Sequence, residues 1–392
     1  MGEWKTLHCP HCINGHVIRK GVRRGKIKYT CTKCHTWFQI NRRTKQHSIL
    51  RIHLSGISFR SLGEVEQIHP STAYRRSYRD LVRLPHCADI TRQYCSRFCG
   101  ILLVDGKYVR VKGYDRKIPV LYGIDYLTHD IPTYIFSIAE NYQTCVSFFS
   151  SLKLLNYPLQ AIVSDDNQNI YQAARYVYPE VVTQLCHNHY KETIRAALSV
   201  RTDVAYLPFM REIEYLFEKR RSPEEFLHVA GKITYRYGHD SRCMNVLVDI
   251  QRRLPMLTAY MRLKRIPRTT NLIESFNSHL EGRLKTIKGF QSFKHADQWL
   301  NAYFIKRRLT KFTSCGKHFW FLNGTTSLQK TMQDPSKITD LLKLIRWPFL
   351  QRCANLLSGW RDSNSQPHRP KRCALANCAT PRIQPLFKRY YM

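Results

Sequence analysis

Three carboxylates stand in the sequence where an acidic side chain is unusual. Asp105 interrupts an apolar run, Asp165 ends another, and Glu274 lies near the start of an amphipathic segment at 271–285. Carboxylates that are brought together repel each other and lose hydration unless divalent cations neutralise them. Their hard oxygens suit Mg²⁺, and two such ions about 3.5–4 Å apart can clamp the attacking and leaving oxygens of a phosphodiester. The pattern therefore predicts metal-dependent phosphodiester chemistry.

Each of these acids also has a purely structural interpretation. Asp105 precedes a glycine and could be a turn residue, whereas Asp165 could cap the helix that follows it. Asp166 competes with Asp165 for any catalytic role. Glu274 fits a capping box in which Asn271 is the N-cap residue. None of the acids favours catalysis by itself. The three together do, given a strand order that makes the strands of Asp105 and Asp165 neighbours.

Four cysteines near the start of the chain have the spacing of a zinc site. They form two C-x₂-C pairs, Cys9 with Cys12 and Cys31 with Cys34, and strand-like runs lie between the pairs. This spacing lets both thiolates of a pair point at one Zn²⁺. The pattern is typical of a zinc ribbon, a unit so small that it needs its metal to fold. Four unrelated buried thiols are the alternative, and three histidines are spare candidate ligands: His8, His11 and His35.

Another cysteine and a histidine, Cys186 and His189, follow the last predicted strand. A thiolate and an imidazole at this spacing can bind zinc, but two ligands make an incomplete site. The alternative is a buried thiol and a hydrogen-bonded histidine next to the sheet. Both interpretations stay open at this point.

The elements that must position the acids form a layered pattern between residues 98 and 310. Predicted strands span 101–111, 120–126, 133–138, 160–165 and 181–185, and predicted helices span 144–155 and 169–176. Three strands followed by helix, strand, helix and strand predict an α/β fold with a mixed, ribonuclease-H-like sheet. In such a sheet the centre of the first strand neighbours the end of the fourth, which brings Asp105 close to Asp165. A helical insertion at about 190–265 precedes the helix that carries Glu274.

Residues 44–85 predict a helix-turn-helix, with helices at 46–54, 59–68 and 72–81 and with Ser71 as N-cap of the third. That third helix carries Arg75, Arg76 and Arg79. A basic recognition helix can contact bases or phosphates in the major groove. A solvated basic helix that only packs on its neighbour is the alternative.

The charge of the chain favours a polyanionic partner. Among 392 residues, 63 are Lys or Arg and 28 are Asp or Glu, so the net charge is +35. Basic side chains that neutralise phosphates release condensed counterions. This excess argues against a binder of acidic proteins and against an enzyme that handles only small molecules, and a hydrophobic fraction of 43% excludes wholesale disorder.

The sequence also indicates the cellular compartment of the protein and the boundaries of its domains. We expect no membrane span, because no apolar stretch is long enough, and no secretory signal, because the start lacks an apolar core. Without such a signal, 14 cysteines indicate a reducing compartment. The expected units are a zinc ribbon, a helix-turn-helix, a catalytic domain, a helical region and a poorly ordered basic tail, at 1–40, 44–85, 98–310, 311–358 and 359–392.

In combination these segments resemble the DDE transposases of the Mutator-like superfamily, in particular the prokaryotic insertion-sequence type with a variant zinc-binding N-terminus. The resemblance covers roughly residues 100–310, and its Gln-x-Cys-x-x-His and Thr-Asn-x-x-Glu-x-x-Asn segments are specific in combination. It rests on residues 104–106, 163–165, 184–189, 268–277 and 288–290. One departure is Asp166, where the family commonly has glycine.

The resemblance implies a DNA transposase whose catalytic triad, Asp105, Asp165 and Glu274, binds two Mg²⁺ or Mn²⁺ ions, with structural Zn²⁺ elsewhere. Cys186 and His189 match the family's C-x₂-H pair. Such enzymes bind the terminal repeats of their element, cut its ends and join the 3′-hydroxyls to target DNA. The expected partner is therefore double-stranded DNA, the expected assembly at least a dimer, and the expected location the cytoplasm and nucleoid of a prokaryotic cell. The alternatives are a non-catalytic, domesticated DNA-binding regulator and an RNA-processing nuclease on the same fold.

Overall fold

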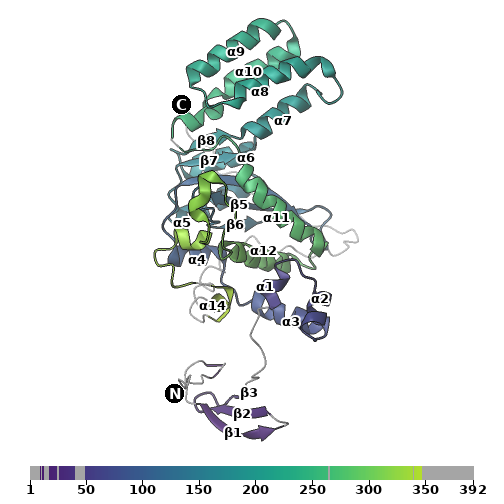
Figure 1. Cartoon of the computed structure of the whole chain (residues 1–392), viewed down its shortest axis with the longest axis vertical. Coiled ribbons are helices and arrows are strands. Elements are labelled where there is room, and N and C mark those ends of the chain that lie inside the picture. The colour runs from purple at the N-terminus through teal and green to yellow at the C-terminus, as the bar shows by residue number, and fades with distance from the viewer. Residues whose placement is uncertain are drawn as a thin grey trace, which may run out of the picture.

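The protein is described from a computed structural model, shown in Figure 1. The structure describes residues 9, 11–12, 17–23, 26–39, 49–263, 265–338 and 340–346. The basic tail that we expect at 359–392 lies outside these residues, as does the end of the helical region predicted at 311–358. Within the described part of the chain, no helix has both the length and the apolar character that a bilayer span requires.

The first unit is a small antiparallel sheet in the order β1-β2-β3, drawn in purple in Figure 1. Its strands are β1 (Val17–Arg23), β2 (Lys26–Cys31) and β3 (Trp37–Gln39). The register of β1 shifts between Arg19 and Gly21. Gly21 has a φ of 111° there, which glycine adopts at little cost, so this bulge bends the hairpin without strain.

Four short helices follow: α1 (Ile49–His53), α2 (Phe59–Val65), α3 (Pro70–Leu81) and α4 (Cys87–Tyr94). The helix that we predicted to start after Ser71 begins earlier, at Pro70, and its N-cap is His69. The reason is that proline fits the first helical turn, where its missing N–H is not needed. The imidazole of His69 then accepts the backbone N–H of Ser71 at 3.3 Å. The prediction of Ser71 as N-cap was therefore wrong.

The centre of the molecule is a five-stranded mixed sheet in the order β6-β5-β4-β7-β8. Its strands are β4 (Ile101–Val109), β5 (Ile118–Asp125), β6 (Tyr134–Phe136), β7 (Ala161–Ser164) and β8 (Val182–Leu185). β4, β5 and β6 are antiparallel neighbours, whereas β7 and β8 run parallel to β4. The predicted mixed sheet is thus confirmed, and its ribonuclease-H-like classification stays a prediction.

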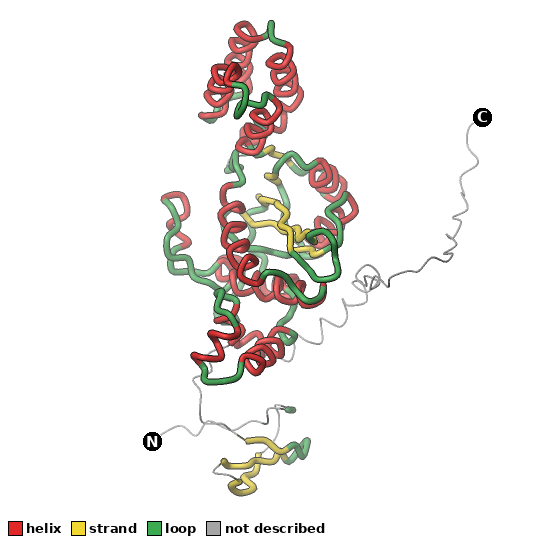
Figure 2. The backbone as a smooth tube through the Cα atoms, turned by 90° about the vertical axis from the view of Figure 1, so that its right-hand side faces the viewer, coloured by secondary structure: helices red, strands yellow, loops and turns green. Residues whose placement is uncertain are grey.

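Both faces of this sheet are covered, because alternate side chains of β4 enter two different hydrophobic clusters. Leu103 packs in the cluster that contains residues of α11 (Asn271–Ile287) and α12 (Phe293–Arg308). Leu102 packs in the cluster that contains residues of α5 (Tyr142–Leu154) and α6 (Gln168–Val177). Figure 2 shows the strands enclosed by these helices. Since side chains alternate along a strand, Asp105 lies on the same face as Leu103, toward α11.

Beyond β8 the chain forms four helices at the top of Figure 1. They are α7 (His187–Ala197), α8 (Leu207–Glu218), α9 (Pro223–Tyr237) and α10 (Ser241–Leu257). A buried contact ties their end back to the sheet, because Nε2 of His187 lies 2.7 Å from the carbonyl oxygen of Leu257. The Gln184 side chain also accepts the backbone N–H of Tyr260 at 2.8 Å. The segment that leads to α11 therefore starts from a fixed point beside β8.

The described part of the C-terminal region contains short helices at Lys317–Leu322, Ser327–Thr331 and Leu341–Arg346. The helix Ser327–Thr331 is tied to the core through Asp130, which forms a fully buried ion pair of 2.7 Å with Arg308. Ser327 and Thr331 donate to the same carboxylate at 2.9 and 2.7 Å. The buried charges of Arg308 and Asp130 thus compensate each other and are hydrogen-bonded, which offsets the cost of removing them from water.

Candidate functional site

Asp105 lies in β4, and Asp165 comes directly after the neighbouring parallel strand β7. The backbone register pairs Leu103 of β4 with Val163 of β7. Continued by two residues, this register sets Asp105 level with Asp165, which directly follows β7. Asp105 is inside β4 and opposite Tyr122 of β5, so its interpretation as a turn residue was wrong. The observed order places β4 beside β7, as the prediction that the two acids are neighbours requires.

The carboxylate of Asp105 is held from two sides. One oxygen, Oδ1, accepts the backbone N–H of Gly106 at 2.7 Å. The other, Oδ2, accepts the side-chain amide of Asn277 in α11 at 2.5 Å. The amide oxygen of Asn277 in turn accepts the hydroxyl of the buried Tyr122. A chain of hydrogen bonds thus runs from β5 through α11 to the acid in β4.

Burial and like charge act on both aspartates. Burial raises the pKa of Asp105 to about 6, and the neighbouring Asp165 adds to this rise, while the Gly106 amide and His189 oppose it. Burial also raises the pKa of Asp165, and Asp166 adds to that rise, whereas His189 lowers it. A divalent cation relieves both the desolvation and the like-charge repulsion of two partly buried carboxylates.

Glu274 lies in the first turn of α11, where Thr270 is the N-cap residue. The Thr270 hydroxyl donates to Oε1 of Glu274 at 2.6 Å. No side-chain hydrogen bond caps this helix, so the capping box that we considered, with Asn271 as N-cap, was wrong. The carboxylate therefore points into the site and does not cover the backbone amides of its own helix.

Cys186 and His189 meet Glu274 at the same point. Nε2 of His189 is 3.8 Å from Oε1 of Glu274. The hydrogen bond with Cys186 raises the pKa of His189 to about 9, against the effect of burial. Burial opposes a low pKa for the Cys186 thiol, but hydrogen bonds from His189 and Thr270 lower it overall. Their interaction thus favours the ionised form of each side chain, because it lowers the pKa of the Cys186 thiol and raises the pKa of the His189 imidazole.

Asp166 has a different environment from Asp165. Its Oδ1 lies 2.5 Å from Nη1 of Arg253 in α10. The N-cap of α6 is Asn167, so the interpretation of Asp165 as the cap of that helix was wrong. Because Asp166 is engaged by Arg253, Asp165 is the better candidate for a metal ligand at this position.

The acids that we predicted as one triad fall into two adjacent groups. Asp105 and Asp165 form one, and Glu274 joins Cys186 and His189 in the other, where the ligand atoms lie within 4.8 Å of one another. In the part of the chain that the structure describes, no three-ligand set this compact contains Asp105 or Asp165. The charge of His189 links the groups, because it acts on the pKa of both aspartates.

The four N-terminal cysteines gather as we predicted. Their sulfur atoms lie within 4.8 Å of one another, with 3.6 Å between Cys9 and Cys34 and 3.5 Å between Cys12 and Cys31. Backbone amides at 11 and 33 donate to Cys9 and Cys31, both at 3.4 Å. These distances suit tetrahedral Zn²⁺, whose bonds to sulfur are about 2.3 Å. His11 and His35 are exposed and are not in this group, and His8 lies outside the described residues.

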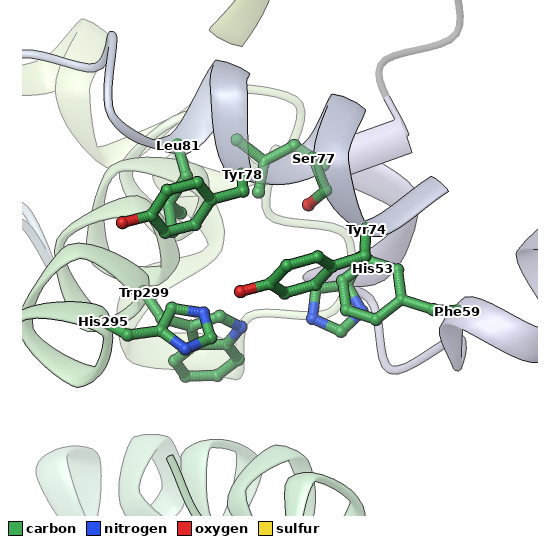
Figure 3. A pocket seen from close by; sticks show the side chains of 9 residues that line it. His53, Phe59, Tyr74, Ser77, Tyr78, Leu81, His295 and Trp299 are labelled. Carbon is green, nitrogen blue, oxygen red and sulfur yellow. The ribbon is translucent and has the colours of Figure 1, made fainter. Parts of the chain in front are cut away.

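The helix α3 has two distinct faces. Arg75, Arg76 and Arg79 are exposed on one of them. The other face borders a small cavity against α12, which Figure 3 shows from close by. The labelled residues around this cavity are His53, Phe59, Tyr74, Ser77, Tyr78, Leu81, His295 and Trp299. The arginines are therefore presented outward from a helix that packs directly on the core.

Sequence reasoning missed one acid beside the site, Glu140. Its carboxylate accepts the Tyr108 hydroxyl at 2.9 Å and the Asn167 amide at 3.0 Å. A Cβ atom on Gly106 would come within 2.8 Å of the same carboxylate. Glu140 therefore connects β4 to the loop that follows Asp165. The available signal was Gly106 itself, since a glycine inside a strand often marks the close approach of another group.

The comparisons with known proteins are sparse. No protein-family model matches the chain, and no curated protein matches it. Among solved structures, the chain is similar to a Drosophila P element transposase strand transfer complex, at 13% sequence identity and a TM-score of 0.27. This likeness covers 79% of this chain and 93% of that chain. A TM-score this low does not establish a common fold.

Proposed function

We propose that this protein is a DNA transposase of the DDE type, with a ribonuclease-H-like core and with Asp105, Asp165 and Glu274 as its catalytic acids. The observation that carries the proposal is the parallel register of β4 and β7, whose last pair, Leu103 with Val163, comes two residues before Asp105 and Asp165. The order β6-β5-β4-β7-β8, with two antiparallel pairings followed by two parallel ones, supports this classification of the core.

The three acids would hold Mg²⁺ or Mn²⁺. Their oxygens are the donors that these ions prefer. Burial, with a smaller contribution from Asp165, raises the pKa of Asp105, and a bound cation would favour its ionised form. When bound, two ions supply positive charge that activates an attacking oxygen and stabilises the leaving one. Asn277 holds Asp105 in place, and Thr270 orients Glu274. Water and then a DNA 3′-hydroxyl would be the successive nucleophiles.

The DNA ends would be bound outside this acidic site. The exposed arginines of α3, Arg75, Arg76 and Arg79, are suited to phosphates and base edges in a major groove. The Cys9/Cys12/Cys31/Cys34 cluster would hold structural Zn²⁺ and stabilise the sheet beside it. A net charge of +35 supports a partner as anionic as duplex DNA.

The experiment is a cleavage and strand-transfer assay with full-length protein. Its substrate is duplex DNA that carries the inverted sequences bracketing the gene, with Mg²⁺ or Mn²⁺ added. Wild-type protein should nick the ends and join them to a plasmid, and D105A, D165A and E274A should not. Exposed Glu180 provides a matched control, so E180Q should keep full activity.

The same experiment separates the alternatives. A protein that binds the DNA ends but does not nick them with either metal is a non-catalytic regulator. A protein that prefers structured RNA to duplex DNA at fixed salt is an RNA-processing nuclease. Cleavage that persists in D105A would overturn the assignment of the acids.

A further inference from the structure

We propose that Cys186, His189 and Glu274 form a second zinc site, distinct from the four N-terminal cysteines. Zinc bound there would withdraw Glu274 from the magnesium site, and this second clause rests on the function proposed above. The site would make the enzyme sensitive to free zinc.

The three ligand atoms already have the separations of a zinc centre. One sulfur, one imidazole nitrogen and one carboxylate oxygen lie within 4.8 Å of one another. His189 Nε2 and Glu274 Oε1 are 3.8 Å apart. Tetrahedral zinc with bonds of about 2.0–2.3 Å places its ligand atoms roughly 3.3–3.8 Å from each other. Only small side-chain adjustments would be needed to bind an ion.

The Thr270 hydroxyl marks the region where the three ligands converge. It lies 3.0 Å from Sγ of Cys186, 3.4 Å from Nδ1 of His189 and 2.6 Å from Oε1 of Glu274. Thr270 comes from the segment before α11, whereas Cys186 and His189 come from the end of β8 and from α7. The fold therefore joins parts of the chain that are 81 and 84 residues apart around one point.

The site combines one buried ligand with two that an ion can reach. Cys186 is fully buried, but the side chains of His189 and Glu274 are 42% and 40% exposed. Three protein ligands leave the fourth position of a zinc ion to water. Thiolate and imidazole select zinc over magnesium, because magnesium prefers oxygen ligands. Zinc and magnesium would thus compete for Glu274 and for no other ligand.

The test is zinc stoichiometry measured on the full-length chain. Titration of metal-stripped wild-type protein should show two zinc ions per chain, one of them bound by the N-terminal cysteines. C186S and H189Q should each bind one, since the loss of a direct ligand costs more than the roughly 10–100-fold that loss of a supporting contact costs. His189 is partly exposed, so H189Q should fold even where C186S does not.

Two controls keep the result specific. C145S removes a buried thiol in α5 and should still bind two zinc ions. In Co²⁺-loaded C12S/C31S, which keeps only two of the N-terminal thiols, a thiolate-to-cobalt absorption band should remain, and it should disappear when C186S is added to these two substitutions. One zinc ion per wild-type chain, or two in both C186S and H189Q, would overturn the site.

The competition between zinc and magnesium for Glu274 is tested separately, by inhibition of DNA cleavage. Zinc should inhibit Mg²⁺-dependent DNA cleavage by the wild-type protein, with a midpoint that matches the occupancy of the Cys186 site. Unchanged cleavage at full occupancy would overturn the sharing of Glu274. A protein that never cleaves DNA would refute the proposed function, yet the stoichiometry would still decide the zinc site.

Discussion

Asn277 of α11 donates a hydrogen bond to Asp105 of β4 across 2.5 Å, although 172 residues separate the two in sequence. A second contact, an ion pair of 3.0 Å between Lys107 and Glu281, joins the same strand and helix farther along. These contacts fix the rotation of α11 on the sheet. Glu274 lies about one turn before Asn277, so the same rotation decides where its carboxylate points.

Replacing Asn277 by alanine should impair both stability and cleavage. The change leaves the buried Tyr122 hydroxyl without its partner, which should cost about 1–3 kcal/mol of unfolding free energy. It also releases Asp105, so cleavage should fall by about 10–100-fold, as for the loss of a metal-supporting contact. Urea denaturation and the cleavage assay measure the two effects. Ser278 donates only within its own helix, at 3.1 Å, so S278A is the matched control and should behave like wild type.

The buried pair Arg308–Asp130 should be far more sensitive than an exposed ion pair. In D130N the guanidinium of Arg308 stays buried without its countercharge, which should cost about 3–5 kcal/mol of unfolding free energy. Arg236 and Glu212 are 57% and 30% exposed, so E212Q should cost less than about 1 kcal/mol. Urea denaturation of both variants checks this contrast. Equal losses would mean that the Arg308–Asp130 pair is not a structural centre.

Alanine at Gly106 should disturb the site from the side of Glu140. The new Cβ would lie 2.8 Å from the Glu140 carboxylate, which must then move away from Tyr108 and Asn167. We expect cleavage to drop by about tenfold or more, since this contact supports the loop of Asp165. Gly231 of α9 has open space around it, so G231A should keep cleavage and gain about 0.5–1 kcal/mol of stability. Undiminished cleavage in G106A would show that the Glu140 contacts do not support the site.

Acid should destabilise the fold through His129, which is 6% exposed. Burial lowers the pKa of His129 from 6.5 to about 4. As the pH falls from 6.5 toward 4, the unfolded chain therefore binds a proton that the folded chain does not, and stability decreases. This one group should cost about 2 kcal/mol between about pH 7.5 and about pH 5.

The variant H129N tests this contribution, because asparagine tolerates the φ of 54° found at this position. Urea denaturation of wild type and H129N at the two pH values should show a shallower loss in the variant by that amount. An identical pH dependence in both proteins would show that His129 is not neutral in the folded state.

The sequence by itself determined the local elements and the types of chemistry. Continuous apolar runs at 101–104 and 161–163 give strands that are buried on both faces, because successive side chains enter the two clusters that cover the sheet. The C-x₂-C spacing predicted the group of four thiols, because the two thiolates of each pair can reach the same ion. Helix starts were less secure, as Ser71 and Asn271 show, because several neighbouring residues can cap a helix and the fold selects one of them.

Only the tertiary structure decided which groups share a site. The engagement of Asp166 by Arg253, the contact of Glu140 with Asn167 and the convergence of Cys186 and Glu274 on Thr270 all depend on how segments far apart in the sequence pack around the sheet. Contacts across such distances in sequence leave no periodic pattern in the chain. They are set by packing and by the need of each buried polar group for a partner, and these are properties of the whole fold.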